Sequence, residues 1–104
     1  MVVQLDNVEK LYELGQKYYY KREYKKAIRY FSRITILQPS FFGAHFFLSA
    51  LYETTGEIKK AIEQFEILVT LKPKDIELKD FLIKLYFKSR EYRKLISFLR
   101  NLIE

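Results

Sequence analysis

The segment EYKKAIRYF at residues 23–31 recurs as EIKKAIEQF at residues 57–65, and the related segment EYRKLISFL occupies residues 91–99. The three segments begin 34 residues apart, and Pro39 and Pro73 repeat with the same spacing. A fixed period of about 20 to 50 residues is typical of repeat proteins, in which each unit is one supersecondary structure that packs on its neighbours. The sequence therefore predicts three copies of one structural unit.

Each unit has the pattern of two helices. In the first unit, Leu11, Gly15 and Tyr18 share one face of a helix, and Ala27 and Phe31 share one face of a second helix. The chain has only three Gly and two Pro, which disfavours a fold with many strands and turns. We place the units at about residues 8–41, 42–75 and 76–104, within a single domain over residues 1–104.

Local signals predict where the helices begin and end. Asp6 and Glu9 resemble a capping box, which would open the first helix. Pro39 cannot continue a helix, so it should close the first unit, and Ser40 is then the expected N-cap of the next helix. Gly56 marks the turn between the two helices of the second unit.

Small residues stand where the two helices of a unit should approach most closely: Gly15 and Ala27 in the first unit, and Ser49 and Ala61 in the second. A small side chain at these positions lets the two backbones come close together. In the third unit, Ile83 and Leu95 occupy the matching positions. We therefore expect the third copy to be degenerate, with its two helices further apart.

This pattern resembles the tetratricopeptide repeat (TPR) family. The resemblance rests on the 34-residue period, a Leu followed by Gly or Ser, a Tyr three residues later, and then Ala, Phe and Pro, and it covers essentially the whole chain. The family prefers a bulky residue, often Trp, early in the first helix; Leu11 satisfies that preference loosely, and His45 departs from it. The resemblance implies an all-α fold, a right-handed α-solenoid of three antiparallel helix pairs.

In this family the first helix of each unit lines a concave groove. On these helices a second stripe lies about 100° from the packing stripe, and it is rich in aromatic residues. We therefore predict an aromatic-lined groove for a partner protein, formed by Tyr12, Gln16, Tyr19, Tyr20, Phe46, Phe47, Ala50, Glu53, Asp80, Phe81, Lys84 and Phe87. Aromatic residues at helical spacing more often belong to a core, and we assign to the core Tyr18, Tyr24, Tyr52, Phe65 and Tyr86.

The best-known TPR activity is to grip the C-terminal carboxylate of chaperone peptides with Lys, Asn, Asn, Lys and Arg. The matching positions here hold Tyr12, Gln16, Phe47, Glu77 and Phe81, so this clamp is absent. A partner segment that offers apolar side chains, either extended or as an amphipathic helix, suits such a groove better. The expected function is that of a protein-interaction adaptor or scaffold.

Two alternatives remain open. The formal charge is +6, and one basic stretch could contact nucleic acid or an acidic protein through Lys17, Lys21, Arg22, Lys25, Lys26, Arg29 and Arg33. A solvated outer helix face is the simpler interpretation of this stretch, and nucleic acid is the less expected partner. The last helix has a wide apolar face, which predicts self-association, or a longer repeat array, through residues that include Ile96, Phe98 and Ile103.

Catalysis is not expected. The chain has no Cys and a single histidine, His45, with no partner at a recognisable spacing, and it contains no phosphate-binding loop or nucleophile motif. We therefore predict no enzyme activity, no cofactor and no metal site. The first residues do not resemble a secretory signal, and no apolar run approaches the length of a membrane span, so a cytoplasmic protein is expected.

Overall fold

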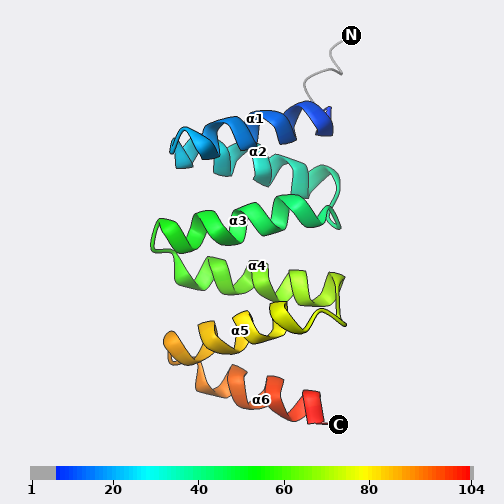
Figure 1. Ribbon diagram of the computed structural model, residues 1–104, viewed down its shortest axis with the longest axis vertical. Helices are drawn as coiled ribbons and strands as arrows, with labels where there is room; N and C mark the ends of the chain where they lie inside the picture. The colour runs from blue at the N-terminus through cyan, green and yellow to red at the C-terminus, as the bar shows by residue number, and fades with distance from the viewer. Residues whose placement is uncertain (1–6, 104) are drawn as a thin grey trace.

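The computed structural model describes residues 7–103, and these residues form six helices and no strand (Figure 1). In chain order the helices are α1 (Val8–Tyr20), α2 (Tyr24–Leu37), α3 (Phe42–Thr54), α4 (Ile58–Leu71), α5 (Ile76–Lys88) and α6 (Tyr92–Ile103). They form three antiparallel pairs in a helical repeat solenoid. The predicted all-α fold of three helix pairs is therefore confirmed. None of the described helices has the length and apolarity that a membrane span requires.

The helices stack in sequence order along one axis (Figure 1). Close packing joins each helix mainly to the one before it and the one after it. The molecule measures 51 × 25 × 18 Å and has a radius of gyration of 15.0 Å, whereas a compact domain of this length would have a radius of about 13 Å. The chain is therefore elongated, as expected when each unit contacts only its neighbours.

A core cluster that includes Phe31 of α2 and Leu48 of α3 joins the first unit to the second. Gly15 of α1 lies against the fully buried ring of Phe31 of α2, and a Cβ atom on Gly15 would stand only 2.7 Å from Phe31 Cζ. Ala27 and Ala61 are both fully buried. The small residues at these positions therefore allow the close approach of helices that the sequence predicted.

The third unit differs from the other two. Its helices, α5 and α6, share a much smaller contact than α1 with α2 or α3 with α4. Ile83 and Leu95 stand where the other units have small residues, and these larger side chains hold the two helices apart. The predicted degeneracy of the third copy is confirmed.

The turn inside each unit has the same conformation in all three copies. Arg22, Gly56 and Arg90, spaced 34 residues apart, have φ angles of 63°, 82° and 61°. In the first unit, the Arg22 N–H donates to Tyr19 O, and the Glu23 N–H donates to Tyr18 O. Equivalent pairs of bonds occur in the other two units. This is the Schellman motif, which ends a helix with one residue in the left-handed region.

Two predicted caps need correction. Ser40 is not the N-cap of α3, because Phe41 holds that position without a side-chain bond and packs its ring 5.1 Å from that of Tyr12. The ring contact between units thus determines where α3 begins. Asp6 lies outside the described residues. At the start of α1, the side chain of Asn7 caps the helix by accepting the Lys10 N–H at 3.1 Å.

Candidate functional site

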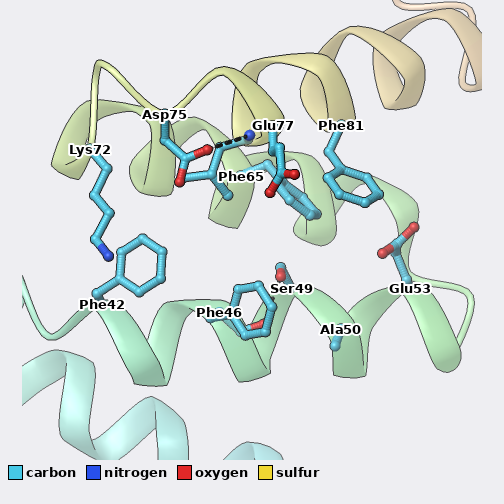
Figure 2. A pocket seen from close by; sticks show the side chains of 11 residues that line it. Phe42, Phe46, Ser49, Ala50, Glu53, Phe65, Lys72, Asp75, Glu77 and Phe81 are labelled. Atoms are coloured by element: carbon cyan, nitrogen blue, oxygen red, sulfur yellow. Dashed lines mark hydrogen bonds between the residues drawn. The ribbon is translucent and has the colours of Figure 1, made fainter.

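A groove of about 380 Å³ opens between α3 and α5, with α4 as its floor (Figure 2). Side chains from all three helices, and from the loop between α4 and α5, line it: Phe42, Phe46, Ser49, Ala50, Glu53, Phe65, Lys72, Asp75, Glu77, Leu78 and Phe81. The first helices of the second and third units are therefore the elements that face each other across it.

Two pairs of stacked rings form the apolar walls of the groove. Phe42 and Phe46 of α3 have ring centroids 6.2 Å apart, and Phe65 of α4 and Phe81 of α5 have centroids 5.9 Å apart. Phe46 is 47% exposed and Phe81 is 55% exposed, whereas Phe65 is buried beneath them. Large exposed rings that face each other across a hollow are typical of interaction sites.

Most polar groups of the groove are already engaged. The Ser49 hydroxyl donates to Phe46 O at 2.7 Å, and the Asp75 carboxylate accepts the Leu78 N–H at 3.2 Å. At one end, Lys72 Nζ lies 4.0 Å from the centroid of the Phe42 ring. These contacts fix the polar side chains against the protein itself.

The carboxylates of Glu53 and Glu77 are different. Neither has an ion-pair or hydrogen-bond partner among residues 7–103, and Figure 2 shows both extending toward the space between α3 and α5. Glu53 comes from the α3 wall, and Glu77 comes from the α5 wall. They are therefore available to a bound ligand.

Four of the twelve residues predicted for the groove line this hollow: Phe46, Ala50, Glu53 and Phe81. Tyr12, Tyr19 and Phe47 instead pack together between α1 and α3, with Phe47 5.9 Å from Tyr12 and 5.1 Å from Tyr19. Phe47 also stacks on Phe31 at 4.8 Å. Partial burial, with a smaller effect of Tyr20, raises the pKa of Tyr12. The rings therefore fill the space between the first two units.

Residues at equivalent positions of the repeat explain why the junction between the first and second units is filled, whereas the junction between the second and third units is hollow. Phe41 stands at the first junction and packs its ring on Tyr12, whereas the equivalent residue at the second junction, 34 positions later, is Asp75. Asp75 has no ring to fill the space and turns its carboxylate to cap α5. Glu53 likewise stands 34 positions after Tyr19, so two positions that carry a ring between the first two units carry a carboxylate at the hollow.

The remaining predicted groove residues lie outside the hollow. Asp80 and Lys84 of α5 form an exposed ion pair at 3.0 Å. Phe87 is 64% exposed, and its ring lies 6.0 Å from that of Tyr92. Tyr20 is exposed at the end of α1, where its ring contacts that of Tyr19. Gln16 is half-buried on α1.

Residues 8–41 match the sequence pattern described as tetratricopeptide repeat. The first unit of the chain therefore carries a tetratricopeptide repeat (TPR), and the match covers 34 of the 104 residues.

Solved structures share the TPR fold of this chain. A crystal structure of MamA protein has a TM-score of 0.78 at 24% identity, with 95% of this chain and 54% of that chain covered. A structure of the CopN–Scc3 complex has a TM-score of 0.76 at 22% identity, with 89% and 55% covered. The chain thus spans about half the length of these proteins. No curated protein matches the sequence.

The sequence missed several residues of the groove: Phe42, Ser49, Phe65, Lys72, Asp75, Glu77 and Leu78. Phe42 precedes Phe46 by one helical turn, so extending the aromatic stripe of this TPR unit backwards would have found it. Phe65 was assigned to the core, where it is indeed buried, yet its ring also forms part of the groove floor. Lys72 and Asp75 come from the loop region between α4 and α5, where the helical periodicity that predicted the groove does not apply.

The aromatic residues assigned to the core divide into two groups. Phe65 and Tyr86 are buried. Tyr18, Tyr24 and Tyr52 are half-buried and pack against the outside of the core. Tyr18 stacks its ring on that of Tyr30 at 5.7 Å and remains open to solvent on the basic side of the first TPR unit.

The basic stretch surrounds a second, smaller hollow of about 260 Å³ in the first TPR unit, lined by Tyr18, Lys26, Arg29, Tyr30 and Arg33. Lys17, Lys21 and Lys26 each place their ammonium group between 5.1 and 5.9 Å from the Tyr18 ring centroid. Lys26 also pairs with Glu23 at 3.3 Å. Arg22 and Lys25 are exposed nearby.

Two other predicted features have clear positions. On α6, Ile96 and Ile103 are exposed, whereas Phe98 is half-buried with its ring 6.0 Å from that of Tyr86.

His45 is buried on α3, and its two ring nitrogens lie 2.7 Å from Gln64 Oε1 and 2.7 Å from Pro39 O. His45 therefore links three segments of the structure. No three metal-binding side chains gather anywhere in residues 7–103.

Proposed function

We propose that this TPR protein docks an apolar segment of a partner protein in the groove between α3 and α5. The observation that carries this proposal is the placement of two exposed rings, Phe46 and Phe81, on facing walls of a hollow of about 380 Å³. Binding sites for small ligands start at about 300 Å³. The groove therefore suits a few anchoring side chains of a segment rather than a long peptide.

The two rings can supply a useful part of the binding free energy. Phe46 and Phe81 are each about half exposed, so covering both buries roughly as much apolar surface as one whole phenylalanine side chain. Burial on that scale stabilises a complex by about 2 kcal/mol, which corresponds to roughly a 30-fold change in affinity. Removing both rings should therefore weaken binding measurably.

The test uses peptides selected from a random 12-residue display library on the wild-type protein. We expect Phe46→Ala combined with Phe81→Ala to weaken their binding by at least tenfold, measured by fluorescence anisotropy, because the apolar anchors of the groove are lost. Circular dichroism should remain unchanged, since both rings are half exposed. Tyr20→Ala, which removes an exposed ring outside the groove, is the matched control and should bind like wild type. Unchanged binding by the double variant would rule out this groove.

One observation favours a second candidate function, contact with an acidic partner through the first TPR unit. Residues 17–33 contain seven Lys or Arg and one Glu, a net charge of +6 that equals the charge of the whole chain. Tyr19 and Tyr30 already pack on Phe47 and Tyr18, so this surface offers phosphate or carboxylate contacts rather than base stacking on those rings. Retention on heparin that falls steeply with salt supports this candidate, and no retention at low salt contradicts it.

A further inference from the structure

The groove carries a charge preference as well as an apolar one. We infer that it selects a partner segment with a basic side chain, Lys or Arg, next to its apolar residues. This inference rests on the proposed function, because it specifies what the same groove accepts. It depends on the two carboxylates, Glu53 and Glu77, that extend toward the hollow from opposite walls (Figure 2).

The lining of the groove has a local excess of negative charge. Three acidic residues and one basic residue line the groove: Glu53, Asp75, Glu77 and Lys72. The chain as a whole carries +6, so the groove is an acidic region in a basic protein. Because the overall charge would favour an anion, any preference of the groove for a cation must come from the groups that line the groove.

Covering the two carboxylates with a bound segment costs free energy, because it removes water from them. Among residues 7–103, Glu53 and Glu77 have no hydrogen-bond or ion-pair partner, so water solvates them in the free protein. A purely apolar segment that closes the groove would remove part of this water and leave two charges without compensation, which is unfavourable. A Lys or Arg on the segment replaces the lost water with a charge-assisted hydrogen bond.

The aromatic rings of the groove also favour a basic side chain. A cation bound at Glu53 or Glu77 lies in a groove that Phe46 and Phe81 also line, and aromatic faces attract cations. The protein already uses this contact at one end of the same groove, where Lys72 Nζ lies 4.0 Å from the Phe42 ring centroid. The aliphatic stem of a Lys or Arg also packs well on such rings.

The same groove disfavours an acidic segment. A carboxylate on the partner would meet Glu53 and Glu77 at short range, and such like-charge contacts are a common basis of specificity.

The test is an array of 12-residue peptides with capped ends and a fixed set of three leucines at helical spacing. At each other position in turn the peptide carries Lys, Gln or Glu in an alanine background. We expect the best Lys peptides to bind roughly fivefold more tightly than their Gln counterparts, which is the scale of two partly exposed ion pairs. The Glu counterparts should bind more weakly still, and added salt should reduce all these differences.

Two variants locate the effect. Glu53→Gln combined with Glu77→Gln should remove the advantage of Lys over Gln while the Gln peptides keep their affinity. Glu63→Gln is the matched control, because Glu63 is an exposed carboxylate of α4 that does not line the groove. This variant should retain the full preference for Lys.

The outcomes separate this inference from the proposed function. If Lys and Gln peptides bind equally and their binding needs Phe46 and Phe81, the charge preference is wrong and the apolar groove stands. If the preference for Lys survives in the double Gln variant, Glu53 and Glu77 do not cause it and the inference is again wrong. If no peptide of any kind binds through the groove, both proposals fail.

Discussion

At the scale of single residues, the tightest packing constraint in the chain falls on Gly15. Replacing glycine by alanine within a helix normally stabilises it by about 1 kcal/mol. Here the new Cβ would lie 2.7 to 3.0 Å from three atoms of Phe31, whose ring is fully buried and stacked on Phe47. Because overpacking a core costs about 1 to 3 kcal/mol, we expect Gly15→Ala to lower the free energy of unfolding by about 1 kcal/mol in urea titrations.

The control for this prediction is Gly43→Ala. A Cβ on Gly43 would meet the hydroxyl end of the Tyr12 side chain at 2.5 Å. Tyr12 is only half-buried, so its outer end can move away more easily than the ring of Phe31 can. Gly43→Ala should therefore cost clearly less than Gly15→Ala. Equal losses in the two variants, or a gain for Gly15→Ala, would contradict the packing argument.

Some residues could be predicted from the sequence alone, and others depend on contacts between units. Gly15 was identifiable because its role depends on the partner helix of its own unit, which the period locates. Ser40 was mispredicted as a cap because the ring of Phe41 packs on Tyr12, a contact across 29 positions of sequence. Local cap preferences contain no information about such a contact, so tertiary packing decided where α3 begins.

At the scale of elements, the turn within each unit gives a second prediction. Arg22 and Arg90 hold the left-handed conformation that Gly56 holds in the second unit. Residues with a Cβ pay a steric cost of about 1 to 2 kcal/mol there, which glycine avoids. We expect Arg22→Gly and Arg90→Gly each to raise the free energy of unfolding by about 0.5 to 1 kcal/mol, because part of the gain is offset by glycine's greater chain entropy.

Thermal and urea unfolding measure this effect, and the second unit supplies the reciprocal variant. Gly56→Ala should destabilise the protein by a similar amount, since no other atom lies within 4 Å of the new Cβ and only the backbone conformation is affected. If both Arg→Gly variants are less stable than wild type, the side chains of Arg22 and Arg90 contribute more than their backbone strain costs.

A hydrogen bond joins α4 to α5 in the third unit and makes stability depend on pH. Tyr86 donates to Glu66 Oε2 at 2.6 Å, and Lys94 Nζ of α6 lies 3.7 Å from the same oxygen. Burial, with the bond to Glu66 as a smaller cause, raises the pKa of Tyr86 well above its ordinary value of 10.0. The folded state therefore holds this proton more tightly than the unfolded state does.

The sign of the pH effect follows from this difference. The contribution of Tyr86 to stability is complete below its unfolded pKa of about 10, and it decreases as the pH rises above that value toward the higher folded pKa. We expect the free energy of unfolding to fall between about pH 9 and 11 in urea titrations. The fall should be smaller in Tyr86→Phe, with exposed Tyr92→Phe as the matched control. Identical slopes in wild type and Tyr86→Phe would contradict the assignment.

The groove shows what the sequence pattern of an element can and cannot predict. A helical wheel treats the first helices of all three units alike, so Tyr12 and Phe46 were predicted to line one continuous groove. The structure separates them, because Phe41 fills the junction beside Tyr12 and Asp75 leaves the junction beside Phe46 open. Aligning the units at the junction positions, and not only along the helices, would have revealed this difference.

At the scale of the whole molecule, the stack of helices leaves one end with an apolar surface. α6 packs mainly on α5, and its opposite face exposes Ile96 by 54% and Ile103 by 85%. These two residues are seven positions apart and therefore share one face of the helix. Exposed apolar side chains that share one face favour contact with another protein surface, so we expect two copies to cover this face together.

The expected association is weak. Burying two isoleucines per copy stabilises a dimer by a few kcal/mol, and most of this is offset by the lost freedom of the two molecules. Light scattering at about 100 μM, a concentration suited to weak complexes, should give an average mass above that of the 12.7 kDa monomer. Ile96→Lys combined with Ile103→Lys should return the mass to that of the monomer.

A control variant tests whether association depends on the α6 face or on exposed apolar side chains in general. Ile36 of α2 is 79% exposed, so Ile36→Lys removes an equally exposed apolar side chain on a different unit and should leave the mass of the wild type unchanged. If Ile36→Lys also disperses the assembly, association does not depend on α6. A monomeric mass for the wild type at this concentration would show that the exposed isoleucines of α6 do not hold two copies together. Because Phe98 of α6 packs on Tyr86 and is half-buried, it offers less apolar surface for association than Ile96 and Ile103 do.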